Sequence, residues 1–402
     1  MSLFGDRGPR VLDIMQRAWE ESADLETTPA GVDMMLALAA AHVGVGDDAA
    51  GVVWLEKALP VAERLDLLRQ TATGLGRLSS LLFRVDRPRE ALILLRGTHE
   101  LAVANGLEDV HRGTRTVLTF YEQFADPGAG LAMAREGLEI AGRLGSADYA
   151  FQMVGNAVSC AIRVGDWAWA RALLDEWLTN EITGKFYLEL YAQRAVLKTL
   201  TGAEWAEDLA AAERLLPGIL DPQFASICHW ARAWTAICEG RLPDARREAV
   251  AGGQATNYFV PITFPMAARS ALWAGAAADA TDLVAQLESS VIRGQAVAVD
   301  LVTLRAGIAA LEGRRADAVA GYREALRGWH QLGLAFDEAM AALDLAILLA
   351  PTGREMAEAA AAIDAARATF TRIGAQPLLA RLDAVTSFPA PAGAAGEQPI
   401  NG

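Results

Sequence analysis

The sequence predicts an all-α protein, a right-handed α-solenoid of about nine helix-turn-helix repeats. Alanine, the residue with the highest helix propensity, accounts for 81 of the 402 residues. The alternation of apolar and polar residues that marks β-strands is absent. Turn signals from Gly46 to Gly353 span 307 residues in eight intervals, about 38 residues each. A period of this length, filled by two helices, is typical of a solenoid.

The elements follow from these turns. An N-terminal helix is expected at Val11–Glu21, and a closing helix is expected at Pro377–Val385. The turn signals between them are Gly46-Asp47, Asp86-Arg87-Pro88, Asp126-Pro127, Gly165-Asp166, Gly202, Gly240, Gly275, Gly313 and Gly353. The solenoid is therefore predicted at residues 10–385, between a flexible N-terminus at 1–9 and a disordered Ala/Pro/Gly tail at 386–402.

The most regular repeat surrounds Gly313. An apolar helix from Val297 to Leu311 ends at this glycine, which is in the usual position of a helix C-terminal stop. The helix that follows places its apolar residues on one face and most of its charges elsewhere. That apolar face comprises Ala318, Tyr322, Ala325, Leu326 and Trp329.

Composition and charge exclude several classes of protein. The 36 basic and 50 acidic residues give a net charge of −14, which argues against a sequence-independent nucleic-acid binder. The longest charge-free stretch, residues 249–268, contains glycines and prolines and makes a poor membrane span. Three cysteines are too few for a disulfide framework, and no signal peptide is apparent. These features predict a cytoplasmic protein that binds no nucleic acid and no membrane.

The run Ala306…Gly313…Ala318…Tyr322…Ala325-Leu326 resembles a tetratricopeptide repeat (TPR). That family keeps small residues where its two helices touch, an aromatic residue in the second helix and an Ala-Leu pair near its end. The resemblance implies that the first helices line a concave surface. It also implies a non-catalytic scaffold that binds a protein or peptide partner in this groove.

A second resemblance is narrower. Residues 365–381, AARATFTRIGAQPLLAR, resemble the last repeat of the helical region in large ATP-dependent LuxR-type regulators and cyclase-linked signalling ATPases. The sequence lacks the phosphate-binding loop Gly-x-x-x-x-Gly-Lys-[Ser/Thr], so nucleotide hydrolysis is not carried over. DNA binding is not carried over either. What the resemblance implies is an array that receives a partner or effector in bacterial signalling or transcriptional regulation.

The short motifs in the sequence do not match known catalytic, nucleotide-binding or metal-binding patterns. Gly74-Leu-Gly76 lies inside a predicted helix and lacks the third glycine of a dinucleotide fingerprint. His99-Glu100 lacks the second histidine of a zinc helix, and Cys228-His229 point about 100° apart on a helix. Ser159-Cys160 has no neighbouring histidine in sequence. The prediction is therefore no enzyme, no metal and no cofactor.

An arginine series is the sharpest pattern. Arg194, Arg232, Arg269 and Arg305 recur at intervals of 38, 37 and 36 residues; Arg115 and Arg77 extend the series backward, and Asn156 fills the gap. Residues one period apart stack on the same side of successive repeats. In one interpretation each arginine pairs with a carboxylate of a neighbouring repeat. In the other, this arginine ladder receives an acidic partner segment or an anionic effector.

Aromatic residues gather in the predicted first helices. They are Phe120, Tyr121, Phe186, Tyr187, Tyr191, Trp230, Trp234, Tyr258, Phe259, Phe264 and Trp273. They act either as core spacers between repeats or as the lining of a binding groove. An enclosed pocket formed by Tyr191, Trp230 and Trp234 would favour a small-molecule effector sensor. An open channel would favour a peptide.

Overall fold

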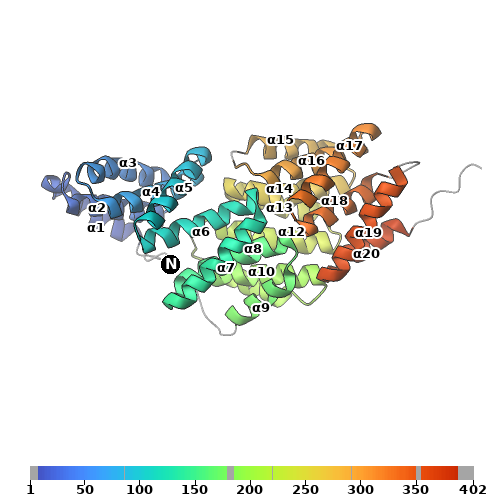
Figure 1. Ribbon diagram of the computed structural model, residues 1–402, viewed down its shortest axis with the longest axis horizontal. Helices are drawn as coiled ribbons and strands as arrows, with labels where there is room; N and C mark the ends of the chain where they lie inside the picture. The colour runs from blue at the N-terminus through green and yellow to red at the C-terminus, as the bar shows by residue number, and fades with distance from the viewer. Residues whose placement is uncertain are drawn as a thin grey trace, which may run out of the picture.

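The computed structural model describes residues 8–85, 87–178, 185–219, 221–290, 292–349 and 355–387. Within these ranges there are twenty α-helices and no strand, which confirms the predicted all-α solenoid (Figure 1). Eighteen of the helices form nine pairs. The first helices are α2 (Pro29–Gly44), α4 (Leu68–Arg84), α6 (Glu108–Ala125), α8 (Ala147–Val164), α10 (Lys185–Thr201), α12 (Gln223–Cys238), α14 (Val260–Trp273), α16 (Gln295–Leu311) and α18 (Ala335–Leu348).

The second helices pack behind them. They are α3 (Asp48–Arg64), α5 (Pro88–Ala104), α7 (Pro127–Leu144), α9 (Trp167–Trp177), α11 (Ala206–Leu215), α13 (Leu242–Ala255), α15 (Ala277–Ser289), α17 (Arg315–Gln331) and α19 (Glu355–Ile373). The N-terminal helix α1 (Gly8–Glu20) starts three residues before its predicted position. The closing helix α20 (Gln376–Thr386) extends one residue beyond each predicted end.

Glycines turn the chain between the two helices of a pair. Gly46, Gly165 and Gly313 have φ of 84°, 87° and 74°, a left-handed conformation that side chains disfavour. The same holds for the predicted turns at Gly202, Gly240 and Gly275. At the Asp126-Pro127 turn the Asp126 side chain caps α7 by accepting a hydrogen bond from the Ala129 amide at 3.0 Å. The predicted turn residues Asp86 and Gly353 lie outside the described residues.

Alanine and glycine lie where helices approach closely. Ala91, Ala170, Ala245 and Ala318 have no exposed surface. At Gly321 in α17, a Cβ atom would lie 2.8 Å from the Cβ of Ala306 in α16, so no side chain fits there. Close helix contacts therefore account for much of the alanine in the sequence.

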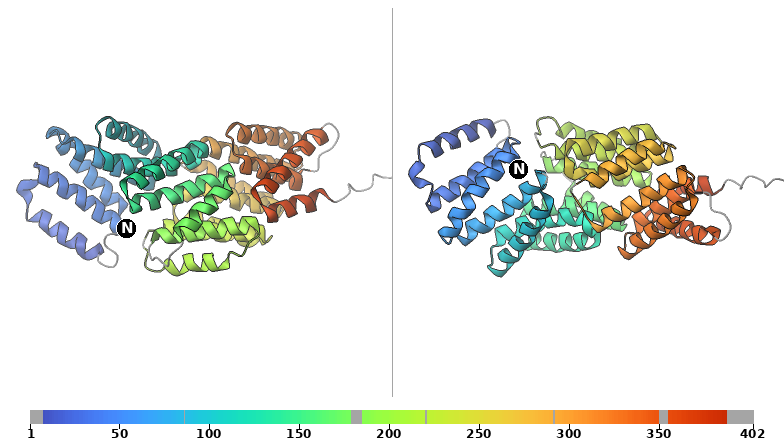
Figure 2. Two further views of the ribbon diagram at one scale, coloured as in Figure 1. Left: turned by 60° about the horizontal axis from the view of Figure 1, so that its bottom comes forward. Right: turned by 90° about the horizontal axis from the view of Figure 1, so that it is seen from above.

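The solenoid closes on itself after five repeats. Helix α16 packs against α6, α18 packs against α8, and α20 packs against α10. Two hydrogen bonds join segments far apart in sequence: Tyr121 donates to the Arg293 carbonyl at 3.2 Å, and Arg381 donates to the Ile237 carbonyl at 2.9 Å. Helices α1–α5 extend as an arm from the closed body formed by α6–α20 (Figures 1 and 2).

The core follows this division. One large cluster of buried apolar side chains runs through α6–α20, and a smaller one fills the arm. In the described part of the chain, no helix is both long and apolar enough to span a bilayer.

Candidate functional site

The closed body contains a chamber, which we define as two adjoining cavities of about 120 and about 260 Å³, and α4 of the arm also lines the second cavity. Both cavities exceed the roughly 10–15 Å³ that one water molecule needs. Seven first helices, α6, α8, α10, α12, α14, α16 and α18, contribute side chains to the first cavity. Four residues line both cavities: Phe120, Phe124, Glu189 and Gln223. First helices from both ends of the closed body therefore line this space, which is partly open to solvent.

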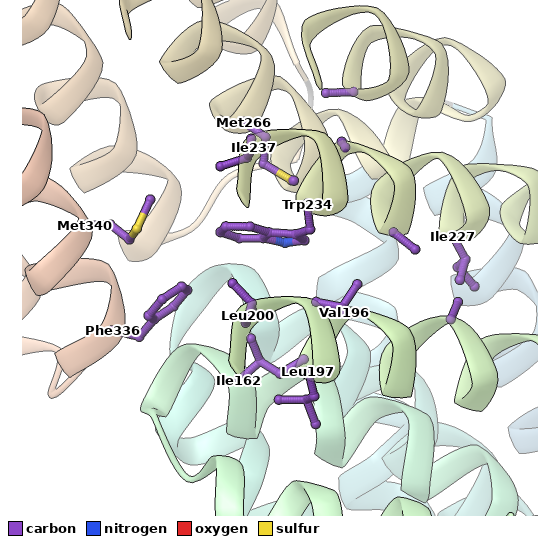
Figure 3. Close-up of a cluster of buried hydrophobic side chains, with 14 of the residues drawn as sticks. Ile162, Val196, Leu197, Leu200, Ile227, Trp234, Ile237, Met266, Phe336 and Met340 are labelled. Atoms are coloured by element: carbon purple, nitrogen blue, oxygen red, sulfur yellow. The ribbon is translucent and has the colours of Figure 1, made fainter. Parts of the chain in front are cut away.

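Aromatic and apolar side chains form most of the wall. Trp230 and Trp234 of α12 line the first cavity together with Phe120 and Phe259. The Trp234 indole lies between α12 and α10, and Phe336 of α18 faces it with ring centroids 5.8 Å apart (Figure 3). Aromatic surfaces of this kind recognise flat or apolar groups in ligands.

The solenoid forms two superhelical turns, because α16–α20 pack against α6–α10. Arg163 of α8 joins these two superhelical turns across the chamber. Its Nε donates to Asp337 of α18 at 3.0 Å, and its Nη2 lies 3.7 Å from Asp300 of α16. Its Nη1 donates to the Gln123 carbonyl of α6 at 3.0 Å. Its guanidinium also lies over the Trp329 ring of α17, 5.5 Å from the centroid. One side chain of α8 thus contacts the nearby helix α6 and three consecutive helices, α16, α17 and α18, that lie far from it in sequence.

A second buried pair reinforces this junction. Arg269 of α14 lines the first cavity and donates to Asp344 of α18 at 2.9 Å. Trp273 donates to the same carboxylate at 2.8 Å. Burial raises the pKa of Asp344, and the neighbouring Arg269 acts against that shift. Asp300 is also buried, and burial raises its pKa to about 7 although Arg163 lies nearby.

Glu189 of α10 faces both cavities without a cation. Among the described residues its carboxylate forms no ion pair, and its one hydrogen bond is a long one, 3.4 Å, from Gln193 Nε2. Burial raises the pKa of the Glu189 carboxyl to about 7. A Cβ atom on Gly155 of α8 would lie 2.7 Å from Glu189 Oε1, so this glycine makes room for the carboxyl group.

Gln193 is the second polar group of the chamber with an unmet hydrogen bond. It is 2% exposed and lines the first cavity. Its Nε2 donates to the Gly155 carbonyl at 2.8 Å and to Ser159 Oγ at 3.0 Å. Its Oε1 accepts no hydrogen bond. A buried hydrogen-bond acceptor without a donor is uncommon in folded proteins, because leaving it unpaired costs free energy.

The structure places every arginine of the predicted partner site beside a carboxylate. The shortest N–O distances are Arg115–Glu136 2.7 Å, Arg194–Asp208 2.6 Å, Arg232–Glu213 2.8 Å, Arg269–Asp344 2.9 Å and Arg305–Glu288 2.7 Å. Four of these partners belong to second helices next to the arginine's own helix. Arg269 differs, because its partner is on α18 and it faces the chamber. The role of the ladder in partner binding stays a prediction.

The remaining members of the series contact neighbouring first helices. Arg77 donates to the Leu36 carbonyl at 2.9 Å, and Asn156 donates to the Thr116 carbonyl at 3.0 Å. Tyr191 is not a lining residue of the chamber, and its ring lies 5.6 Å from the Arg194 guanidinium. The structure therefore brings Trp230 and Trp234 together and leaves Tyr191 outside. The side chain of Phe186 lies outside the described residues.

No metal centre is found in the part of the chain that the structure describes, since no three metal-binding side chains gather there. His99 and His111 form the nearest approach to a histidine pair, with ring centroids 4.8 Å apart. Burial, together with the neighbouring His111 and Arg115, lowers the pKa of His99 to about 4. The two rings fill a contact between α5 and α6, where His99 is hydrogen-bonded to Thr114 at 3.0 Å.

Sequence reasoning missed the polar residues of the chamber, Arg163, Glu189, Gln193, Asp300, Asp337 and Asp344. A signal for three of them was present. Glu189, Asp300 and Asp344 each stand as a lone acid inside an apolar helical stretch, LEL, VDL and LDL. An acid at such a position is costly unless it is paired or functional.

Comparison with known proteins yields one structural likeness. No family model matches the sequence, and no curated protein matches it. Among solved structures, the crystal structure of the P58(IPK) TPR domain is similar over 89% of this chain and 98% of its own, with 13% identity and a TM-score of 0.25. A likeness this low carries no argument about function. Over the described residues, the chain is an all-α helical-repeat protein. That statement rests on its nine helix pairs, turn glycines and small contact residues.

Proposed function

We propose that this protein is a non-catalytic scaffold whose closed body binds a small-molecule effector in the chamber. The observation that carries the proposal is the closure of the solenoid, by which α16, α18 and α20 pack against α6, α8 and α10. A peptide needs an open channel, whereas a cavity of about 120 Å³ lined by Trp230 and Trp234 suits a small molecule. This favours the sensor over the peptide-groove interpretation for the closed body.

The same contacts suggest how an effector would act. Arg163 holds α6, α16 and α18 together around the space that a ligand would fill. A ligand that contacts both turns of the solenoid binds the closed form better than an opened one. It therefore shifts the population toward the closed form.

A partner protein remains a second candidate, on the arm. A third cavity of about 580 Å³ opens between α2, α4 and α6, where small residues such as Ala39, Gly76 and Gly113 line it. It adjoins the chamber, because Ser80, Thr116, Val117 and Gln152 line both it and the second cavity. Exposed large apolar side chains also occur elsewhere on the arm, on its second helices α3 and α5, where Val53 and Ile93 are 64% and 73% exposed. This open surface is the part of the molecule that fits a protein or peptide in the TPR manner. The signalling context, in bacteria, rests on the resemblance of residues 365–381.

The two candidates separate in one experiment. The purified protein and an Ile262→Trp variant, which places an indole in the first cavity, are equilibrated with an extract of the source cells. Bound small molecules and proteins are then identified by mass spectrometry. We expect a small molecule that the wild-type protein retains and the variant does not. Retention of a protein by both forms, with no small molecule on either, would support the arm as the functional surface and count against the chamber.

A further inference from the structure

Three arginines and three carboxyl groups line the chamber, and among the described residues one of these carboxyl groups has no cation beside it. Arg163 is paired with Asp337 and Asp300, and Arg269 is paired with Asp344. In the second cavity, Arg84 lies 2.7 Å from Asp48 and 3.6 Å from Asp221. Every arginine of the lining therefore has at least one carboxylate. Among the described residues, Glu189 is left as a carboxyl group without a cation.

Neighbouring residues also fix the position of the Glu189 carboxyl group. Its carboxyl group fills the space above Gly155, where any side chain would collide with it. Gln193, one helical turn further along α10, holds it weakly through Nε2 and keeps Oε1 free of any donor. Gln193 Oε1 itself has almost no accessible surface, so Glu189 is the acceptor that lines both cavities.

The surrounding wall restricts what that group can be. Glu189 shares both cavities with the rings of Phe120 and Phe124, and Trp230 lines the first cavity as well. Aromatic faces attract organic cations, and tryptophan does so most strongly. The described residues assemble no metal site here, because no three carboxylate, histidine or cysteine side chains gather around Glu189. A bare metal ion is therefore a poor fit, and an anion would meet an unpaired carboxylate.

We propose that the chamber binds an organic cation, a protonated amine carried on an aromatic or apolar skeleton, with Glu189 as its counter-ion. The proposal rests on the proposed function, since it names the class of effector that the chamber takes. The ammonium group would donate to the Glu189 carboxylate while its skeleton lies among the aromatic rings. The raised pKa of the free Glu189 carboxyl fits a site that is completed by a cation.

The test uses matched triplets of probes that differ only in charge. The first triplet is 2-phenylethylamine, 2-phenylethanol and phenylacetate, and naphthyl and indolyl analogues follow it. Binding to the full-length protein is measured by ligand-observed NMR and calorimetry at pH 8. We expect the ammonium member to bind roughly tenfold or more tightly than the alcohol, and the carboxylate to bind weakest.

Three variants locate the effect. Glu189→Gln keeps the shape of the side chain and should reduce the preference for the ammonium probe to near one. Glu100→Gln, on the exposed face of α5, removes the same charge far from the chamber and should change nothing. Ile262→Trp should weaken all three members. Circular dichroism melts confirm that each variant is folded. If Ile262→Trp does not fold, we measure instead whether the alcohol and the ammonium probe compete for binding to the wild-type protein.

The outcomes separate the two proposals. Equal binding of ammonium and alcohol probes, or an unchanged preference in Glu189→Gln, overturns the cation assignment and leaves the chamber as a binding site. If no member of any triplet binds the folded wild-type protein, the chamber is not a ligand site, and both proposals fail.

Discussion

At the scale of single residues, Glu189 shows how a buried acid affects stability. Its pKa rises from the ordinary value near 4.5 to about 7 because burial disfavours the charged form. Between these two values the unfolded chain has lost its proton while the folded protein still holds it. The free energy of unfolding of the ligand-free protein therefore falls as pH rises from about 4.5 to about 7, and this contribution is constant above pH 7.

Glu189→Gln removes this dependence, because glutamine carries no proton to lose. We expect the variant to be more stable than the wild-type protein by about 1–3 kcal/mol at pH 8 and by almost nothing at pH 4.5. Urea unfolding of both proteins at the two pH values measures the difference. A gap between the two proteins that is the same at both values would show that Glu189 ionises normally in the folded state.

Among the helices and turns, the sequence predicts the repeat well because the repeat is local. Gly46, Gly165 and Gly313 stop one helix and start the next, and the structure gives each of them a positive φ. The chamber is not local. The approach of α16 to α6 depends on small tilts added over five repeats, and no short motif records their sum. Arg163 and Asp337 are 174 residues apart, so their pairing could not be read from spacing.

The turn glycines allow a matched comparison. Gly275 has a φ of +75° with no atom near its missing Cβ, so the strain of Gly275→Ala comes from the backbone alone. We expect a loss of about 1–2 kcal/mol in the free energy of unfolding. Gly97 lies inside α5 with open space beside it, and Gly97→Ala should instead gain up to about 1 kcal/mol. Thermal melts that place both variants on the same side of wild type would contradict this account of the turns.

For the whole molecule, the closure makes the body more than a row of stacked repeats. In an open solenoid each repeat contacts only its neighbours, whereas here α8 also packs against α18 and α10 against α20. The buried Arg163 cluster and the Arg269–Asp344 pair lie on that additional interface. Removing one partner of a buried ion pair leaves an uncompensated charge, which is strongly destabilising.

Arg163→Met should therefore open the closure. We expect a loss of about 3–5 kcal/mol from the body and faster hydrogen exchange in α16 and α18, with no change in α2–α4 of the arm. Arg135→Met is the control, because Arg135 pairs with Asp166 while both side chains are about 40% exposed, and it should cost less than about 1 kcal/mol. Equal effects of the two substitutions would mean that Arg163 does not hold the two turns together.

Entry of an organic cation into the chamber is tested most directly by fluorine NMR of protein that carries 5-fluorotryptophan. Trp230 and Trp234 line the chamber, whereas Trp54 lies in the arm beside Trp19. Titration with 2-phenylethylamine should move the Trp230 and Trp234 resonances, assigned by Trp→Phe substitution, and leave that of Trp54 in place. Unchanged Trp230 and Trp234 resonances at saturating probe, or a shift confined to Trp54, would contradict binding in the chamber.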